Sequence, residues 1–110
     1  MNIIKFGGTS VANAQNISLC INIIKQKKQT APVVVVVSAL GGVTDLLLSA
    51  AVSASEKSDD YKQVLEKVEA RHLEVIKTLV PATGQSSVLS HAKRELNRLE
   101  TLLDGCFLLG

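Results

Sequence analysis

Apolar and polar residues follow one another along the chain in blocks that predict strands first and helices afterwards. An apolar start leads into a first strand over 1–6, and five consecutive valines form a second strand over 33–37. Because the valine run is apolar on both faces, it is typical of a parallel strand that is covered on both sides. Apolar residues recur at helical spacing over 13–28. The order indicates one right-handed β–α–β unit over 1–37.

The rest of the chain has the periodicity of helices. A short helix is predicted to end at Ser55, and either Thr44 or Asp45 can cap its start. Two long amphipathic helices follow over 61–80 and 86–103, separated by a predicted turn. Two long helices with a short connection should pack as an antiparallel αα-hairpin.

These elements add up to an α/β chain with two parallel strands and four helices. A βαβα part is expected over 1–57 and a helical hairpin over 58–105. A sheet of two strands is marginal by itself, and a valine run apolar on both faces needs cover on both sides. We therefore predict that residues 1–110 are the N-terminal, incomplete portion of a larger α/β domain.

Composition and charge exclude several classes of function. The formal net charge is only +2, and the chain has three aromatic residues, so no nucleic-acid partner is expected. The longest apolar run is far shorter than a bilayer span and no leader precedes the first strand, so no membrane is expected either. Cys20 and Cys106 fit no metal or redox spacing, which predicts a cytoplasmic setting. His72 and His91 have no partner ligands at metal spacing, so no metal site is predicted.

The segment Lys5-Phe6-Gly7-Gly8-Thr9-Ser10 lies where the first strand passes into a loop and then a helix. Backbone N–H groups converge on anions at such places, and a lysine at the strand end can reach a phosphate as a point charge. Gly7 and Gly8 lack a Cβ atom, so their backbone can approach phosphates and adopt positive φ. Thr9 and Ser10 can donate hydroxyl hydrogen bonds or cap the helix that follows.

A second loop of small and hydroxyl residues, Ser38 to Thr44, follows the valine strand. Ligands of open α/β sheets bind outside the carboxyl ends of the strands, where both loops should meet. The two loops together therefore predict one binding site for an anionic ligand.

The segment 5–10, continued by Val11-Ala12, resembles the opening signature of aspartokinases, members of the amino acid kinase superfamily. The resemblance implies a three-layer αβα kinase domain more than twice as long as this chain. It implies nucleotide binding by Lys5, Gly7, Gly8, Thr9 and Ser10, with Lys5 also catalytic. It further implies substrate contacts from Ser38 and Thr44, ATP with Mg²⁺ as the phosphoryl donor, and a homo-oligomer.

The expected reaction is phosphorylation of the side-chain carboxylate of L-aspartate, the first step of lysine, threonine and methionine biosynthesis. The continuation Val11-Ala12-Asn13-Ala14 is similar to the bifunctional type that is fused to a homoserine dehydrogenase. We expect the 110-residue chain alone to be inactive. Two alternatives stay open: another amino acid kinase with a different acceptor, and a non-catalytic module that forms oligomers through its helical hairpin.

Overall fold

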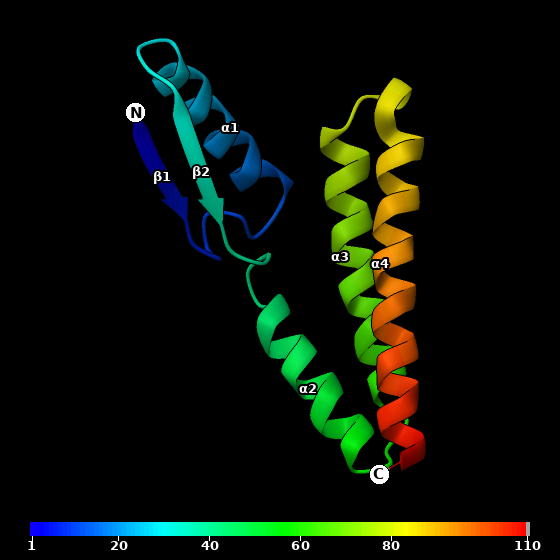
Figure 1. Cartoon of the computed structure of the whole chain (residues 1–110). Coiled ribbons are helices and arrows are strands. Elements are labelled where there is room, and N and C mark those ends of the chain that lie inside the picture. The colour runs from blue at the N-terminus through cyan, green and yellow to red at the C-terminus, as the bar shows by residue number, and fades with distance from the viewer. Residues whose placement is uncertain (110) are drawn as a thin grey trace. The chain divides into compact units, whose positions relative to one another are not determined.

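The computed structural model describes residues 1–109, which form two compact units (Figure 1). The first unit runs from Met1 to Thr44 and the second begins at Asp45. None of the helices in the described residues is both long enough and apolar enough to cross a membrane.

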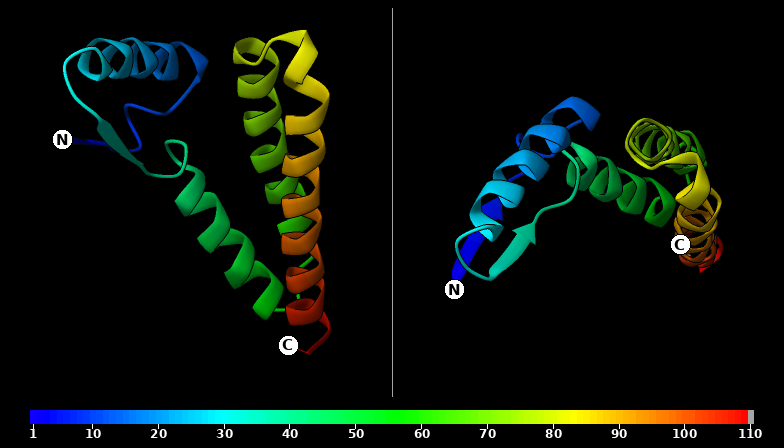
Figure 2. Two further views of the ribbon diagram at one scale, coloured as in Figure 1. Left: turned by 45° about the horizontal axis from the view of Figure 1, so that its top comes forward. Right: turned by 90° about the horizontal axis from the view of Figure 1, so that it is seen from above.

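The first unit is the β–α–β arrangement that the hydrophobic pattern predicts. Strand β1 (Asn2–Phe6) pairs in parallel with β2 (Val33–Val37), with Asn2 opposite Val33 and Phe6 opposite Val37. Helix α1 (Ala14–Lys28) connects the strands and lies along one face of them (Figures 1 and 2). The predicted pair of parallel strands is confirmed.

Helix α1 begins where its polar cap is placed. The side chain of Asn13 accepts a hydrogen bond of 2.9 Å from the N–H of Asn16, which satisfies one of the free donors of the first turn. Thr9 and Ser10 therefore do not cap this helix. Three lysines in the last turn lie where the helix dipole favours positive charge.

Only one face of the two strands is covered within the first unit. Ile4 and Phe6 pack against α1, in a cluster with Val11 and Cys20. Because side chains alternate across a strand, Ile3 lies on the opposite face, where 71% of its surface is exposed. Val34 and Val36 share that face and are exposed, and Val35 and Val37 on the other face are exposed as well, so the expected cover on both sides is absent within this unit.

The second unit is helical. It comprises α2 (Val43–Ser55), whose first two residues belong to the first unit, α3 (Tyr61–Leu79) and α4 (Ala82–Leu109). Helices α3 and α4 run antiparallel side by side, so the predicted αα-hairpin and the count of four helices are confirmed (Figures 1 and 2).

Two helix starts differ from the prediction. Helix α2 begins at Val43, so neither Thr44 nor Asp45 is its cap. Asp45 lies in the first turn, where the helix dipole stabilises a carboxylate. Helix α4 begins at Ala82, directly after Pro81, instead of at residue 86. Gln85 explains the tight turn, because its Nε2 donates to the carbonyl oxygens of Lys77 and Val80 at 3.2 and 3.1 Å.

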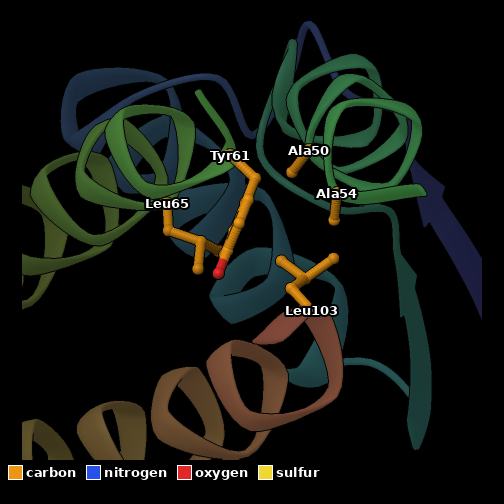
Figure 3. Packing of buried hydrophobic residues seen from close by; sticks show 5 residues of the cluster. All are labelled: Ala50, Ala54, Tyr61, Leu65 and Leu103. Atoms are coloured by element: carbon orange, nitrogen blue, oxygen red, sulfur yellow. The ribbon is translucent and has the colours of Figure 1, made fainter. Parts of the chain in front are cut away.

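The core of the second unit joins its three helices. Alanines on α2 allow close approach, and larger side chains on α3 and α4 fill the space between them. The buried members point toward one another in Figure 3: Ala50, Ala54, Tyr61, Leu65 and Leu103.

Tyr61 is the largest fully buried side chain of this core. Its hydroxyl donates a hydrogen bond of 2.6 Å to Oδ1 of Asp104, and its ring lies 5.7 Å from the ring of Phe107. The hydrogen bond to Asp104, with burial, raises the pKa of Tyr61 to about 12. The hydrogen bond ties the start of α3 to the end of α4.

Candidate functional site

The candidate site lies entirely in the first unit, at the carboxyl ends of β1 and β2. The loop after β1 runs from Gly7 to Asn13, and the loop after β2 runs from Ser38 to Gly42. Since the strands are parallel and in register, both loops leave the same edge of the sheet. This is the edge at which open α/β sheets bind ligands.

Lys5 lies next to the end of β1, opposite Val36 in the register. Since Phe6 faces α1, alternation places Lys5 on the other face of the strands, which α1 does not cover. Its side chain is exposed, and no ion pair of Lys5 occurs among residues 1–109. The ammonium group is thus available to an anion.

Residues 7–11 of the first loop form a turn in which some backbone N–H groups are hydrogen-bonded and others are not. The carbonyl oxygen of Gly7 accepts hydrogen bonds from the N–H groups of Ser10 and Val11, at 3.1 and 3.3 Å. Within the described part of the chain, the N–H groups of Gly7, Gly8 and Thr9 donate no hydrogen bond. Consecutive free amides of this kind are the donors with which loops bind phosphate.

The glycines of the two loops serve different purposes: Gly8 and Gly41 allow close packing, whereas Gly42 has an unusual backbone angle. The expectation of positive φ at Gly7 and Gly8 is wrong: among residues 1–109, Gly42 is the glycine with positive φ, at 83°. A Cβ atom on Gly41 would stand 2.7 Å from the carbonyl oxygen of Gly8, whereas one on Gly7 would meet nothing within 4 Å. Gly41 therefore lets the second loop touch the first.

Ser38 is brought beside the glycine loop. Its Oγ lies 3.6 Å from the position that a Cβ atom of Gly8 would occupy, and its hydroxyl donates a hydrogen bond of 2.6 Å to the carbonyl oxygen of Ala39. Ser38 thus lies next to Gly8.

Thr44 is exposed in the first turn of α2. Among residues 1–109, its side chain makes no hydrogen bond to Gly8 or Ser38. The side chains of Thr9 and Ser10 are exposed too, and their hydroxyl groups have no hydrogen-bond partner in the described residues.

The charge of the first unit favours anions. Residues 1–44 contain four lysines and neither aspartate nor glutamate. Three of these lysines lie in the last turn of α1, so Lys5 is the one adjacent to the loops. No group of three or more metal-ligating side chains that could hold a metal ion occurs in the described residues.

Two contacts of the first loop were missed by the sequence analysis. Nδ2 of Asn16 donates to the carbonyl oxygen of Thr9 at 3.0 Å, and the thiol of Cys20 donates to the carbonyl oxygen of Ser10 at 3.3 Å. The pattern Asn-x-x-Asn at the start of α1 indicates a helix cap, but it does not show that the second asparagine reaches back to the loop.

Parallel strands followed by packed glycine loops are typical of α/β proteins that bind their ligands at the carboxyl ends of the strands. The sequence profile described as the amino acid kinase family matches residues 1–103. The chain belongs to the amino acid kinase family.

Individual relatives agree with the resemblance seen in the opening segment. The chain is 41% identical to an aspartokinase of Chlamydia pneumoniae over 98 residues, which cover 89% of this chain and 21% of that protein. It is 31% identical to bifunctional aspartokinase/homoserine dehydrogenase 2, chloroplastic, of Arabidopsis thaliana, over 96% of this chain and 12% of that protein. The chain thus spans about a fifth or less of the length of these relatives.

A solved structure has the same arrangement of elements. Aspartokinase III of E. coli, in complex with lysine and aspartate, matches with a TM-score of 0.78 at 22% identity, over 98% of this chain and 23% of that chain. This match confirms that the strands and helices are part of an amino acid kinase fold.

Proposed function

We propose that this chain provides the nucleotide-phosphate site of an aspartate kinase, an enzyme that transfers the γ-phosphoryl group of ATP to the side-chain carboxylate of L-aspartate. The observation that carries the proposal is the meeting, at one sheet edge, of an unpaired lysine with three consecutive unpaired amides. The aspartokinase relatives support the choice of aspartate as acceptor. Residues 1–110 are then the first part of the catalytic domain.

The roles follow from charge. Phosphoryl transfer depends mainly on positioning and on stabilising negative charge at the phosphates. In the proposal, Lys5 neutralises charge on the transferring phosphate, while the amides of residues 7–9 and the hydroxyl groups of Thr9 and Ser10 bind the phosphate oxygens. Ser38, beside Gly8, contacts the aspartate carboxylate or the transferred phosphate, and Thr44 contacts the substrate.

No general base is required in this reaction. The aspartate carboxylate has an unperturbed pKa near 3.9, so it is already ionised at neutral pH. The obstacle is repulsion between this anion and the triphosphate, which cationic and N–H groups reduce. The absence of an acidic or histidine side chain from residues 1–44 is consistent with that requirement.

Magnesium does not fit the first unit as a protein-held ion. Mg²⁺ binds through carboxylates and substrate phosphates, and residues 1–44 offer no carboxylate. In the proposal Mg²⁺ arrives bound to the phosphates of ATP, and no step is assigned to its contact with these residues.

The exposure of the site argues against turnover by the 110-residue chain alone. Lys5, Gly7, Thr9 and Ser10 are all exposed, whereas kinases exclude water from the reacting phosphate. We expect the isolated chain to bind nucleotide weakly and to release no ADP. A cytoplasmic, homo-oligomeric enzyme remains our prediction for the protein as a whole.

The test compares Lys5→Met with Lys93→Met, which changes an exposed lysine of α4 in the other unit. Mg-ATP is titrated into the ¹⁵N-labelled chain, and amide shifts are followed. Loss of a charge-assisted hydrogen bond of about 1.5–3 kcal/mol should weaken affinity roughly 10- to 150-fold in Lys5→Met. Lys93→Met should bind like the unaltered chain.

A chimera tests the acceptor. The matching 98-residue segment of the Chlamydia pneumoniae aspartokinase is replaced by this chain, and aspartate-dependent ADP release is measured. We expect activity in the chimera, loss of it with Lys5→Met, and retention with Lys93→Met. Unchanged shifts for Gly7 to Thr9 on addition of Mg-ATP, or equal activity of both lysine variants, would refute the proposed function.

A further inference from the structure

Two side chains of α1 reach back to the loop that the proposed function assigns to phosphate. Asn16 donates from Nδ2 to the carbonyl oxygen of Thr9 at 3.0 Å, and Cys20 donates from Sγ to the carbonyl oxygen of Ser10 at 3.3 Å. The two residues are four positions apart, so they lie on the same face of the helix. That face points at two successive carbonyl groups of the loop.

These carbonyls belong to peptide groups that are also held at their other end. The planar peptide unit that contains the carbonyl of Thr9 also contains the N–H of Ser10, which donates to the carbonyl oxygen of Gly7. The next unit contains the carbonyl of Ser10 and the N–H of Val11, which donates to the same oxygen. Two consecutive peptide planes are therefore fixed from both sides.

Fixing these planes decides which amides remain for a ligand. With the N–H groups of Ser10 and Val11 turned toward Gly7, the unpaired donors within residues 7–11 are those of residues 7–9. If these two peptide planes rotated, the N–H groups of Ser10 and Val11 would lose their hydrogen bonds to Gly7 and become unpaired donors. The helix thus sets the donor pattern of the loop through its side chains.

Packing and hydrogen bonds hold the side chains of Cys20 and Asn16 in place. Cys20 is only 6% exposed and packs in the cluster that contains Phe6 and Val11, the residues on either side of the loop's glycines. Asn16 is half-buried, and its own N–H is held by the cap residue Asn13. Neither side chain needs to move for a ligand to approach residues 7–9.

We propose that Asn16 and Cys20 are positioning residues of the phosphate site, which hold the Thr9 and Ser10 carbonyls so that the amides of residues 7–9 face the phosphate. The inference rests on the proposed function. Both residues act through the loop backbone and touch neither nucleotide nor acceptor. Their loss should therefore loosen the loop and weaken nucleotide binding together.

The test uses two matched pairs in the ¹⁵N-labelled chain. Asn16→Ala removes the donor to Thr9, and its control Asn22→Ala makes the same change at an exposed α1 residue outside the loop contacts. Cys20→Ala removes the donor to Ser10, whereas Cys20→Ser keeps one. The readouts are backbone order parameters of residues 7–9 and the affinity for Mg-ATP.

Loss of one neutral hydrogen bond corresponds to roughly a fivefold change in an equilibrium constant. We expect Asn16→Ala and Cys20→Ala each to weaken Mg-ATP affinity by about that factor and to lower the order parameters of residues 7–9 from about 0.85 toward 0.6. Asn22→Ala and Cys20→Ser should resemble the unaltered chain in both readouts. A residue with only a structural role would lower thermal stability without this change in the loop.

The outcomes separate the inference from the function on which it rests. If the unaltered chain shows no Mg-ATP-induced shifts, the proposed function fails, and the positioning role fails with it. If the unaltered chain binds Mg-ATP and both Asn16→Ala and Cys20→Ala bind it as tightly as the unaltered chain, only the positioning inference is overturned. Weaker binding with an equally ordered loop also overturns it, because the effect would then bypass the backbone.

Discussion

The contact between the two glycine loops can be tested by adding one methyl group. A Cβ atom on Gly41 would stand 2.7 Å from the carbonyl oxygen of Gly8, and 3.0 and 3.3 Å from the Cβ and Cα atoms of Ala12. Two of these three neighbours are backbone atoms, which cannot rotate away as the end of a long side chain can. Gly41→Ala must therefore push the second loop away from the first.

The size of the effect follows from these distances. Comfortable contacts lie near 3.5 Å, so the loops must separate by roughly 0.5–1 Å. Overpacking of a tightly packed contact destabilises by about 1–3 kcal/mol, which is roughly a 5- to 150-fold change in the unfolding equilibrium constant. Gly41→Ala should also weaken Mg-ATP binding, because Gly8 and Ser38 would no longer be adjacent.

Gly7→Ala is the matched control. Its added Cβ atom would meet nothing within 4 Å, and its φ lies outside the left-handed region. Its free energy of unfolding should stay unchanged or rise by up to about 1 kcal/mol, because alanine restricts the unfolded chain. Nucleotide affinity should still fall, since the methyl group is attached beside the unpaired amides.

Urea denaturation followed through amide signals of β1 and α1 measures the first unit directly. The reasoning is wrong if Gly41→Ala unfolds at the same urea concentration as the unaltered chain, or if Gly7→Ala is destabilised as much as Gly41→Ala. Either result would mean that the loops do not pack as closely as the Gly8–Gly41 contact requires.

Two further predictions concern the helical unit. The hydrogen bond to Asp104 raises the pKa of Tyr61 to about 12. The contribution of this hydrogen bond to the free energy of unfolding should therefore be complete below pH about 10 and disappear as the pH rises through 12. Titration of the phenol absorbance should report this pKa directly, since Tyr61 is the only tyrosine, and unfolding curves of Tyr61→Phe should lack the loss of stability above pH 10. In chemical denaturation, Leu103→Ala should lower the free energy of unfolding by about 2–5 kcal/mol, because Leu103 is 5% exposed in the core. The control Leu102→Ala changes a residue of the same helix that is 69% exposed, and it should alter this free energy by about 0.5 kcal/mol or less. Equal effects of the two leucine variants, or a Tyr61 titration near pH 10, would contradict this packing.

Much of the fold could be predicted from hydrophobic periodicity. The valine run and the apolar start correctly predicted both strands, although the cover expected on both faces of the valine strand is absent within the first unit. The start of α4 could not be predicted, because Pro81 and Gly84 also occur in ordinary turns. What permits the helix there is a tertiary feature, the Gln85 side chain that satisfies two carbonyl groups at the end of α3.

The candidate site divides in the same way. The segment 5–10 identified the family, and the parallel strands explain why Ser38 lies beside Gly8. Which glycine adopts positive φ could not be predicted, because every glycine of both loops tolerates it equally. The contacts of Asn16 and Cys20 with the loop could not be predicted, because they depend on how α1 packs against the loop. The spacing of residues in the sequence does not determine that packing.

The exposed face of the first unit and the openness of its site have a common physical basis. Ile3, Val34 and Val36 lie on the face that α1 leaves uncovered, and Lys5 ends the same face at the ligand-binding edge. Apolar surface of this kind is stabilised when another layer packs on it. A layer on that face would also remove water from around the Lys5 ammonium group, where each electrostatic interaction with phosphate then becomes stronger. In the proposed function, covering this face of the sheet would therefore also strengthen the interaction of Lys5 with phosphate, so we expect weak nucleotide binding from the open unit and turnover only from a covered one.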